Sequence, residues 1–354
     1  MMKVMAINSS PRTQGESHSE KMLHLLVEGM RGGGAEVEIV NLREFNIKFC
    51  QGCYTCWTKT PGKCRLKDDM TESLFPKWQA ADLVVYASPL YYRSVVSRLQ
   101  AFIERTLPAL LPYCVAEGER SSHPPRERLP NFVMLSVSGF PDSEEFGPLS
   151  DWAKANFDVP PAKLLAEIYR PGAQTLSLQQ YRAVAGDIYG AVKRAGNEII
   201  RDGIVSETTM ARITQPIVEK DAYFKFANVF WQHCIDEKMT PRQFQKNGAA
   251  PKAKTVEDMM ALLPVGINQI KTMELQSRIQ FRFESDAHND FFMDINRGSV
   301  KAFEGRAASP DLTIITPFQV WSDIMGGLAD GAKQLMEGAY RIEGDGDLLV
   351  RLFA

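Results

Sequence analysis

The chain has 354 residues, of which 44% are hydrophobic and 24% are charged, and its formal net charge is −2. Its length suggests two domains or one large one, and its composition is typical of a soluble globular protein. The charge gives no support for nucleic-acid binding, and no apolar run approaches the 18 residues of a membrane span. Because the run MMKVMAINSS leads into a strand-like segment and not a signal peptide, we expect a cytoplasmic protein without stable membrane insertion.

The first 200 residues alternate between strand-like and helix-like segments. The strands that we expect are Lys3–Asn8, Glu36–Val40, Asp82–Ala87, Asn131–Val137 and Lys163–Tyr169. The helices that we expect are His18–Arg31, Met70–Ala80, Ser97–Leu107, Phe146–Phe157 and Leu178–Arg201. This order predicts an α/β fold with a doubly wound, five-stranded parallel sheet covered on both faces. Such sheets bind ligands at the carboxyl ends of their strands.

The pattern changes after residue 200. An aromatic-rich helix is expected at Tyr223–Ile235, and the Pro-, Gly- and Ala-containing linker Asn247–Thr255 follows it. We therefore divide the chain into residues 1–205, a helical connector and linker at 206–255, and a C-terminal domain at 256–354. The segments expected in the last part are helices at Val256–Leu263, Val320–Gly326 and Gly331–Gly338 and strands at Arg278–Phe283, Asp290–Asn296 and Leu312–Thr316. This order is typical of an α+β domain.

A hydroxyl-rich loop, Ser9–Ser17 (SSPRTQGES), separates the first strand from the first helix. Hydroxyls and backbone N–H groups at a helix N-terminus attract anions, and Arg12 adds a positive charge. Neither G-x-G-x-x-G nor G-x-x-x-x-G-K-[ST] occurs, which makes a nucleoside triphosphate an unlikely ligand. The alternative is a plain turn with a serine N-cap.

Two loops carry a family resemblance over about residues 2–200. SSPRTQGES, and SPLYYRS (Ser88–Ser94) followed by LQAFIER (Leu99–Arg105), resemble the flavodoxin-like NADPH-dependent FMN reductases. Ser9 and Glu16 depart from the Gly and Asn of that pattern. The resemblance implies FMN, an NAD(P)H donor and a homodimer. It also implies phosphate contacts from Ser9, Ser10, Arg12, Ser17 and Ser19, ring contacts from Ser88, Pro89, Leu90, Tyr91 and Tyr92, and weaker contacts from Ser136, Ser138 and Gly139.

Four cysteines lie in one 15-residue window, with the spacing C-x2-C-x2-C-x7-C: Cys50, Cys53, Cys56 and Cys64. Clustered thiols in a reducing compartment favour an iron–sulfur cluster or zinc over structural disulfides. The run also resembles the compact cysteine motif of the iron–sulfur flavoproteins, which implies four ligands of a 4Fe–4S cluster close to FMN. A structural or redox-active thiol loop and a zinc site are the alternatives. Cys114 and Cys234 are expected to be ordinary buried thiols.

Residues 256–354 resemble the sterol carrier protein type 2 (SCP2) domain. The matching runs are IQFRFES, VKAFEGRAASPDLTIIT and MEGAYRIEGDGDLL. The resemblance implies a five-stranded sheet with helices that encloses an apolar tunnel for lipids. The phenylalanines that either line such a tunnel or form the core are Phe281, Phe283, Phe291, Phe303 and Phe318.

These features predict an FMN-dependent NAD(P)H oxidoreductase fused to a lipid-binding module. A 4Fe–4S cluster would relay electrons to a quinone-like or other acceptor, and no residue is assigned as a catalytic acid or base. One alternative is an electron-transfer or redox-sensing flavoprotein that turns over no small substrate. The other is a lipid carrier whose flavin domain is vestigial.

Overall fold

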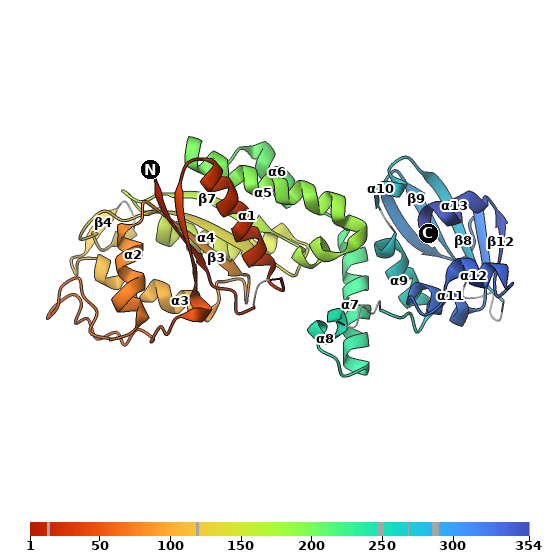
Figure 1. Ribbon diagram of the computed structural model, residues 1–354, viewed down its shortest axis with the longest axis horizontal. Coiled ribbons are helices and arrows are strands. Elements are labelled where there is room, and N and C mark those ends of the chain that lie inside the picture. The colour runs from red at the N-terminus through yellow and green to blue at the C-terminus, as the bar shows by residue number, and fades with distance from the viewer. Residues whose placement is uncertain (13–14, 118–119, 247–250, 268, 285–289, 354) are drawn as a thin grey trace. The chain divides into compact units, whose positions relative to one another are not determined.

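The computed structural model describes all residues except 13–14, 118–119, 247–250, 268, 285–289 and 354. The chain forms two compact units (Figure 1). The first unit comprises Met1–Ser177 and Val184–Pro216, and the second comprises Leu178–Ala183 and Ile217–Ala354. Thr13 and Gln14 of the hydroxyl-rich loop and residues 247–250 of the linker lie outside the described residues. The three-part division drawn from the sequence stays a prediction.

The first unit contains a five-stranded sheet in the order β2-β1-β3-β6-β7, and every neighbouring pair is parallel. Its strands are β1 (Lys3–Asn8), β2 (Glu36–Asn41), β3 (Leu83–Pro89), β6 (Asn131–Val137) and β7 (Leu164–Arg170). The central strands β1 and β3 are almost entirely buried, as expected for a sheet that helices cover on both faces. The predicted doubly wound, flavodoxin-like sheet is confirmed.

The helices of this unit are α1 (His18–Gly32), α2 (Phe75–Ala80), α3 (Ser97–Glu104), α4 (Gly147–Phe157), α5 (Arg182–Asp202) and α6 (Glu207–Thr214). A π-helical turn, η2 (Met70–Leu74), precedes α2, and the 3-10 turns are η1 (Leu42–Glu44), η3 (Leu107–Ala109), η4 (Ser143–Phe146) and η5 (Ala173–Ser177). A further 3-10 turn, η6 (Gln179–Tyr181), belongs to the second unit. Helices α1 and α5 pack very closely, because a Cβ at Gly29 or Gly196 would lie 1.8 or 2.0 Å from a backbone oxygen of the other helix. The sequence analysis missed α6 and the small hairpin of β4 (Val115–Glu117) and β5 (Arg120–Ser122).

The second unit contains a mixed sheet in the order β10-β9-β8-β11-β12. Its strands are β8 (Gln276–Phe283), β9 (Phe291–Asn296), β10 (Ser299–Glu304), β11 (Leu312–Thr316) and β12 (Arg341–Gly344). Only β8 and β11 pair in parallel among the described strands of this sheet. Its helices are α7 (Lys220–Asp236), α8 (Pro241–Lys246), α9 (Val256–Gly266), α10 (Gln269–Thr272), α11 (Phe318–Met325), α12 (Gly331–Met336) and α13 (Gly346–Phe353). The α+β class is confirmed, although β10, β12 and α13 were not predicted.

Aromatic side chains fill the core of the second unit. Phe281 and Phe291 stack at a ring distance of 4.7 Å, and Trp321 meets Phe281 at 5.3 Å and Tyr340 at 5.4 Å. Phe303 is 44% exposed on the edge strand β10, so its alternative place in the core is wrong, and its place in a tunnel wall stays a prediction. An edge strand leaves one of its faces outside the core. The alternation of apolar and polar residues in the sequence does not show which strand lies at the edge. In the described part of the chain, no helix combines the length and apolar character needed to cross a bilayer.

Candidate functional site

The loop that joins β1 to α1 forms a buried cluster of hydroxyl groups, and we call residues 9–19 the phosphate loop. Ser17 is the N-cap of α1, and its Oγ accepts a hydrogen bond from the backbone N–H of Glu20 at 3.1 Å. The Ser17 hydroxyl also bonds to those of Ser10 at 2.8 Å and Ser19 at 3.2 Å. All three serines are 6% exposed or less. Hydroxyls and N–H groups at the positive end of a helix form a suitable site for a phosphate.

Ser9 has a different role from its neighbours. Its backbone N–H and its Oγ both donate to the carbonyl of Ala87, at 2.9 and 2.8 Å. These bonds tie the phosphate loop to the end of the adjacent strand β3. The Ser9 hydroxyl therefore supports the loop, whereas those of Ser10, Ser17 and Ser19 lie at the helix terminus.

Charged groups surround the phosphate loop. Arg43 donates to Glu20 Oε1 at 2.8 Å and to the carbonyl of Arg12 at 3.2 Å, so that it neutralises a buried acid in the first turn of α1. Burial, together with the nearby charges of Lys21 and Arg12, lowers the pKa of His18 to about 4. His18 is therefore neutral at physiological pH. Sequence reasoning missed His18 and Arg43, because only the fold brings Arg43 to this loop.

The loop after β3 carries two exposed tyrosines. Tyr91 and Ser94 exchange backbone hydrogen bonds at 3.0 Å, and the two residues between them, Tyr92 and Arg93, have φ values of +50° and +57°. Non-glycine residues in this region cost about 1–3 kcal/mol each. Tyr91 is 47% exposed and Tyr92 is fully exposed, so both rings are free to meet a flat ligand.

Ser88 and Leu90 have structural bonds within the same edge of the sheet. The Ser88 Oγ accepts from the Val96 N–H at 3.1 Å and donates to the carbonyl of Pro89 at 2.9 Å. The N–H of Leu90 donates to the carbonyl of Val137 at 2.9 Å. These bonds hold the β3 loop beside the end of β6.

The loop after β6 completes this edge. Ser138 Oγ accepts from the N–H of Phe140 at 3.0 Å, and a Cβ at Gly139 would lie 3.1 Å from Gln174 Nε2. Ser136 is fully buried, and its Oγ has no hydrogen-bond partner among the described residues. Ser136 also pairs in register with Ser88. An orphaned buried hydroxyl next to the two ring-contact loops fits a bound polar ring such as that of FMN.

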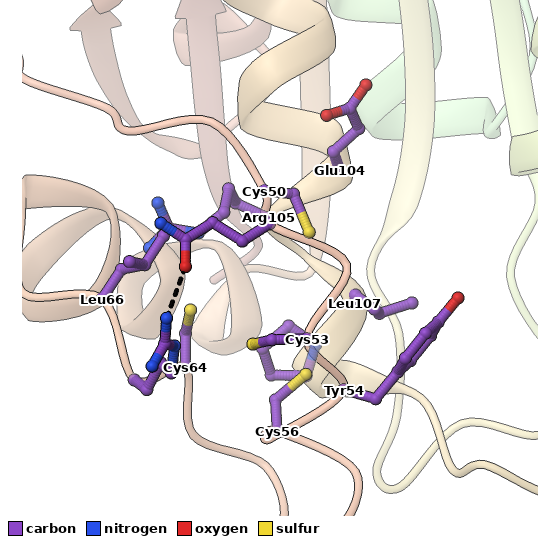
Figure 2. Close-up of a pocket in the computed structure, with 12 residues that line it drawn as sticks. Cys50, Cys53, Tyr54, Cys56, Cys64, Leu66, Glu104, Arg105 and Leu107 are labelled. Atoms are coloured by element: carbon purple, nitrogen blue, oxygen red, sulfur yellow. Dashed lines mark hydrogen bonds between the residues drawn. The ribbon is translucent and has the colours of Figure 1, made fainter.

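The four clustered cysteines line one pocket, which Figure 2 shows in close-up. Gly52 and Gly62 have φ values of +58° and +79°, which lets the loop between η1 and η2 turn sharply. Cys56 is buried, Cys50 and Cys64 are half-buried, and Cys53 is exposed. Four thiols in one pocket are the donor set of an iron–sulfur cluster. Within the described residues, no three Cys, His, Asp or Glu side chains are arranged to hold a metal ion.

The thiols of this pocket differ in their electrostatics. Burial raises the pKa of Cys56, and the neighbouring Cys64 raises it further. A hydrogen bond from the Thr55 hydroxyl to the sulfur, at 3.4 Å, lowers the pKa of Cys53. Cys53 is therefore the more readily ionised of these two thiols. Outside the cluster, Cys234 is buried as expected, whereas Cys114 is exposed beside the β4–β5 hairpin, and its prediction as a buried thiol is wrong.

A buried ion pair lies where the cysteine loop begins and ends. The two nitrogens of Arg105 reach the carboxylate of Asp68 at 2.7 and 3.0 Å. Burial raises the pKa of Asp68, but hydrogen bonds from Arg105, Lys48 and Thr71 outweigh it and hold the pKa below its usual range. Burial lowers the pKa of Arg105, but Asp68 and the nearby Cys64 outweigh it and hold that pKa above its usual range.

The two acids before the following turn have different partners. Asp68 Oδ1 accepts from the N–H of Thr71 at 3.1 Å, and Asp69 Oδ2 accepts from the N–H of Asn46 at 2.6 Å. Both acids thus hold the chain around the cysteine loop.

Comparisons with known proteins find a family match at each end of the chain. Residues 2–119 match the NADPH-dependent FMN reductase family, and residues 267–353 match the SCP-2 sterol transfer family. The chain is also similar to an iron-sulfur flavoprotein of Archaeoglobus fulgidus, with 39% identity over 107 residues, which are 30% of this chain and 46% of that one. An iron-sulfur flavoprotein of Methanosarcina thermophila is 29% identical over 106 residues, 30% of this chain and 53% of that one. The chain thus spans about half the length of the curated relatives it matches.

Two solved structures are similar to 56% of this chain. An NAD(P)H:quinone oxidoreductase from Methanothermobacter marburgensis is 17% identical, with 96% of that chain covered and a TM-score of 0.42. An FMN-dependent NADH-azoreductase from Bacillus anthracis in complex with FMN is 16% identical, with 100% covered and a TM-score of 0.43. Over residues 2–119 the chain is thus similar to the NADPH-dependent FMN reductases, and over residues 267–353 it is similar to the SCP-2 sterol transfer family.

Proposed function

We propose that the first unit binds FMN and uses it to oxidise NAD(P)H. The observation that carries this proposal is the buried cluster of serine hydroxyls at the N-terminus of α1, in a domain that matches the FMN reductase family. The hydroxyls of Ser10, Ser17 and Ser19, with the charge of Arg12, would hold the FMN phosphate. Ser9 would hold the loop in shape through its two bonds to Ala87.

The flavin ring would lie against the loops after β3 and β6. Backbone groups of Ser88, Pro89 and Leu90 would meet its polar edge, and Tyr91 or Tyr92 would cover its face. Ser138 and Gly139 would contact it from the neighbouring strand end, and the orphaned Ser136 hydroxyl would gain a partner there. Bound FMN would supply two-electron chemistry toward a nicotinamide and one-electron chemistry toward a metal centre. The chain's own contribution is to bind and orient the ring, and we assign no catalytic acid or base.

The second part of the proposal concerns the cysteines. Cys50, Cys53, Cys56 and Cys64 line one pocket, and the relatives that match this part of the chain are named iron-sulfur flavoproteins. We propose that these four thiolates hold a 4Fe–4S cluster, which would pass electrons between FMN and an acceptor such as a quinone. A zinc site or a metal-free thiol loop is the competing outcome for the same residues.

The remaining parts of the proposal follow the family matches. The SCP2 domain would bind a lipid or another apolar ligand, and the full protein would work as a homodimer in the cytoplasm. A lipid-binding domain fused to a reductase suggests that an apolar molecule accepts the electrons. The domain division proposed with this function is residues 1–205, 206–255 and 256–354.

An anaerobic visible spectrum of the purified full chain tests this function. FMN gives bands in the near ultraviolet and the blue, and a 4Fe–4S cluster adds a broad brown absorption. Iron, acid-labile sulfide and zinc assays on the same sample separate the three outcomes for the cysteines. Bleaching of the flavin band on addition of NADPH or NADH is the expected result, and a protein without flavin contradicts the proposal.

An electron-transfer or redox-sensing role without substrate turnover is the second candidate. The resemblance to proteins named only as iron-sulfur flavoproteins favours it, because those names state no substrate. A yellow-brown protein that neither nicotinamide reduces in a stopped-flow experiment would support this candidate over the first.

A further inference from the structure

The cysteine loop, residues 48–68, is closed at its neck by one buried ion pair. Asp68 Oδ2 accepts from the backbone N–H of Lys48 at 2.8 Å, and Arg105 Nη1 donates to the carbonyl of Lys48 at 2.7 Å. Arg105 and Asp68 also bind each other through two parallel hydrogen bonds. The two ends of the loop are therefore held at one point, and all four clustered cysteines lie between them.

Burial makes this ion pair unusual. The exposed fractions of the Arg105 and Asp68 side chains are 1% and 0%. An isolated buried ion pair adds little to stability, because desolvation offsets its attraction, and an apolar pair of similar size often serves as well. A role at this place is therefore the more informative explanation of the pair, and Arg105 lines the cysteine pocket.

One hydrogen-bond donor of the Arg105 side chain lacks an acceptor in the described part of the chain. Its two terminal nitrogens bond to Asp68, Lys48 and Thr71, whereas its Nε is buried and has no acceptor among the described residues. Arg105 lines the same pocket as Cys50, Cys53, Cys56 and Cys64 (Figure 2). Cysteine sulfur accepts hydrogen bonds, and a thiolate accepts them more strongly than a thiol.

We propose that Arg105 is the positioning residue of the cysteine centre. Through Asp68 and Lys48 it fixes the neck of the loop, and its free Nε–H and positive charge serve the sulfurs of the cluster that the proposed function places in this pocket. The effect of Arg105 on the sulfurs thus rests on that proposed function. The fixing of the loop's neck by Arg105, Asp68 and Lys48, which we call the clasp, does not depend on it. Net charge and hydrogen bonds to sulfur are among the factors that set the reduction potential of an iron–sulfur cluster.

The signs of the expected effects are opposite for the two partners. A cluster bound by four thiolates is negatively charged and gains a further electron on reduction. The Arg105 cation therefore stabilises the reduced state, and Arg105→Gln lowers the potential. The Asp68 anion opposes reduction, so Asp68→Asn raises the potential. Arg105→Lys keeps the charge but loses the paired geometry and the Nε donor, and its potential lies between those of Arg105→Gln and the wild type.

The test uses the full chain, purified anaerobically. Iron, acid-labile sulfide and flavin are measured for each variant, and the cluster potential is measured by spectroelectrochemical titration. Arg170→Gln is a matched control, because Arg170 is a buried arginine of the same unit whose Nε also lacks a partner among the described residues, but it bonds to carbonyls of Ile213 and Gln215. We expect opposite shifts for Arg105→Gln and Asp68→Asn, faster loss of iron to a chelator in both Arg105 variants, and no shift in the control. Equal potentials, or shifts of one sign, overturn the proposal.

A wild-type protein without iron and sulfide would instead contradict the cluster in the proposed function. The clasp is then tested by the rate of backbone hydrogen–deuterium exchange in residues 49–66 of the same variants. Exchange that is about tenfold faster in Arg105→Gln than in Arg170→Gln, which corresponds to about 1.4 kcal/mol of local opening, supports the clasp. Equal exchange in the two variants overturns it.

Discussion

The phosphate loop and the cysteine loop both follow strands of the parallel sheet, but they are held in different ways. The hydroxyls of Ser10, Ser17 and Ser19 bond to one another and to the first turn of α1, so this hydroxyl cluster is built from short-range contacts. Ser9 and Arg12 of the same loop bond to distant parts of the chain, at Ala87 and Arg43. The cysteine loop is instead closed by Arg105, which comes from the end of α3 far along the chain. The hydroxyl cluster is therefore made by residues close in sequence, whereas the neck of the cysteine loop depends on a distant charge pair.

The largest expected effect lies in the cysteine loop. Cys56→Ser removes the buried thiol of the cluster, and we expect complete loss of iron and sulfide, because the proposed 4Fe–4S cluster uses all four thiolates of the loop. Flavin content should stay near the wild-type level, since the described residues of the phosphate loop have no hydrogen bond to the cysteines. Cys114→Ser, at an exposed cysteine outside the loop, is the control. Full iron content in Cys56→Ser contradicts the ligand assignment.

The phosphate loop should respond in a graded way. Ser10→Val removes one hydroxyl that bonds to Ser17, and we expect FMN to bind about 10- to 100-fold more weakly, since a hydrogen bond to a charged group contributes about 1.5–3 kcal/mol. Fluorescence titration of the deflavinated protein measures the dissociation constant. Ser143→Ala, at the start of η4, is a control outside the loop. Unchanged affinity in Ser10→Val would show that the phosphate binds elsewhere.

His18, a half-buried histidine of the phosphate loop, predicts a pH dependence of stability. The pKa of His18 is about 4 in the folded protein and about 6.5 when unfolded, so below pH 6.5 the unfolded chain binds a proton that the native state does not. The contribution of neutral His18 to the free energy of unfolding is thus intact above pH 6.5. It falls between pH 6.5 and 4 and is lost below pH 4. His18→Asn should flatten this part of the stability curve by on the order of 2–3 kcal/mol in urea unfolding.

The control for this prediction is His24→Asn, an exposed histidine on the same helix. Its curve should follow the wild type through the acid range. If His18→Asn also follows the wild type, His18 is not held neutral by the loop.

The smallest expected effect concerns the strained turn after β3. This turn lies outside both the phosphate loop and the cysteine loop. Arg93 has a φ of +57°. Arg93→Gly should relieve this backbone strain and stabilise the first unit by about 1 kcal/mol. The loss of the weak, exposed ion pair between Arg93 and Glu145 reduces this gain. Arg93→Ala loses the same ion pair without relieving the strain and is the matched control. A Gly variant no more stable than the Ala variant in thermal unfolding would show that the turn stores no strain.

The sequence predicted the elements whose patterns are local and missed those that depend on neighbours. Apolar periodicity identified all five strands of the parallel sheet, and SSPRTQGES pointed to the serines that cluster at α1. Strands β10 and β12 were not predicted. Edge strands such as these bury few side chains and therefore show little apolar periodicity. The role of Asp68 at the neck of the cysteine loop was also missed, because it depends on Arg105, which lies 37 residues away from Asp68.

By itself, the sequence determined the fold class, the presence of two dissimilar domains and the residue types of both loops, since short-range periodicity and turn chemistry are written in consecutive residues. Tertiary structure alone decided which hydroxyls face one another, that Ser136 is buried without a partner, and that Arg105 and Asp68 close the cysteine loop. The reason is physical: burial and ion pairing depend on distances between residues far apart in the chain, and those distances exist only once the sheet and its helices have packed.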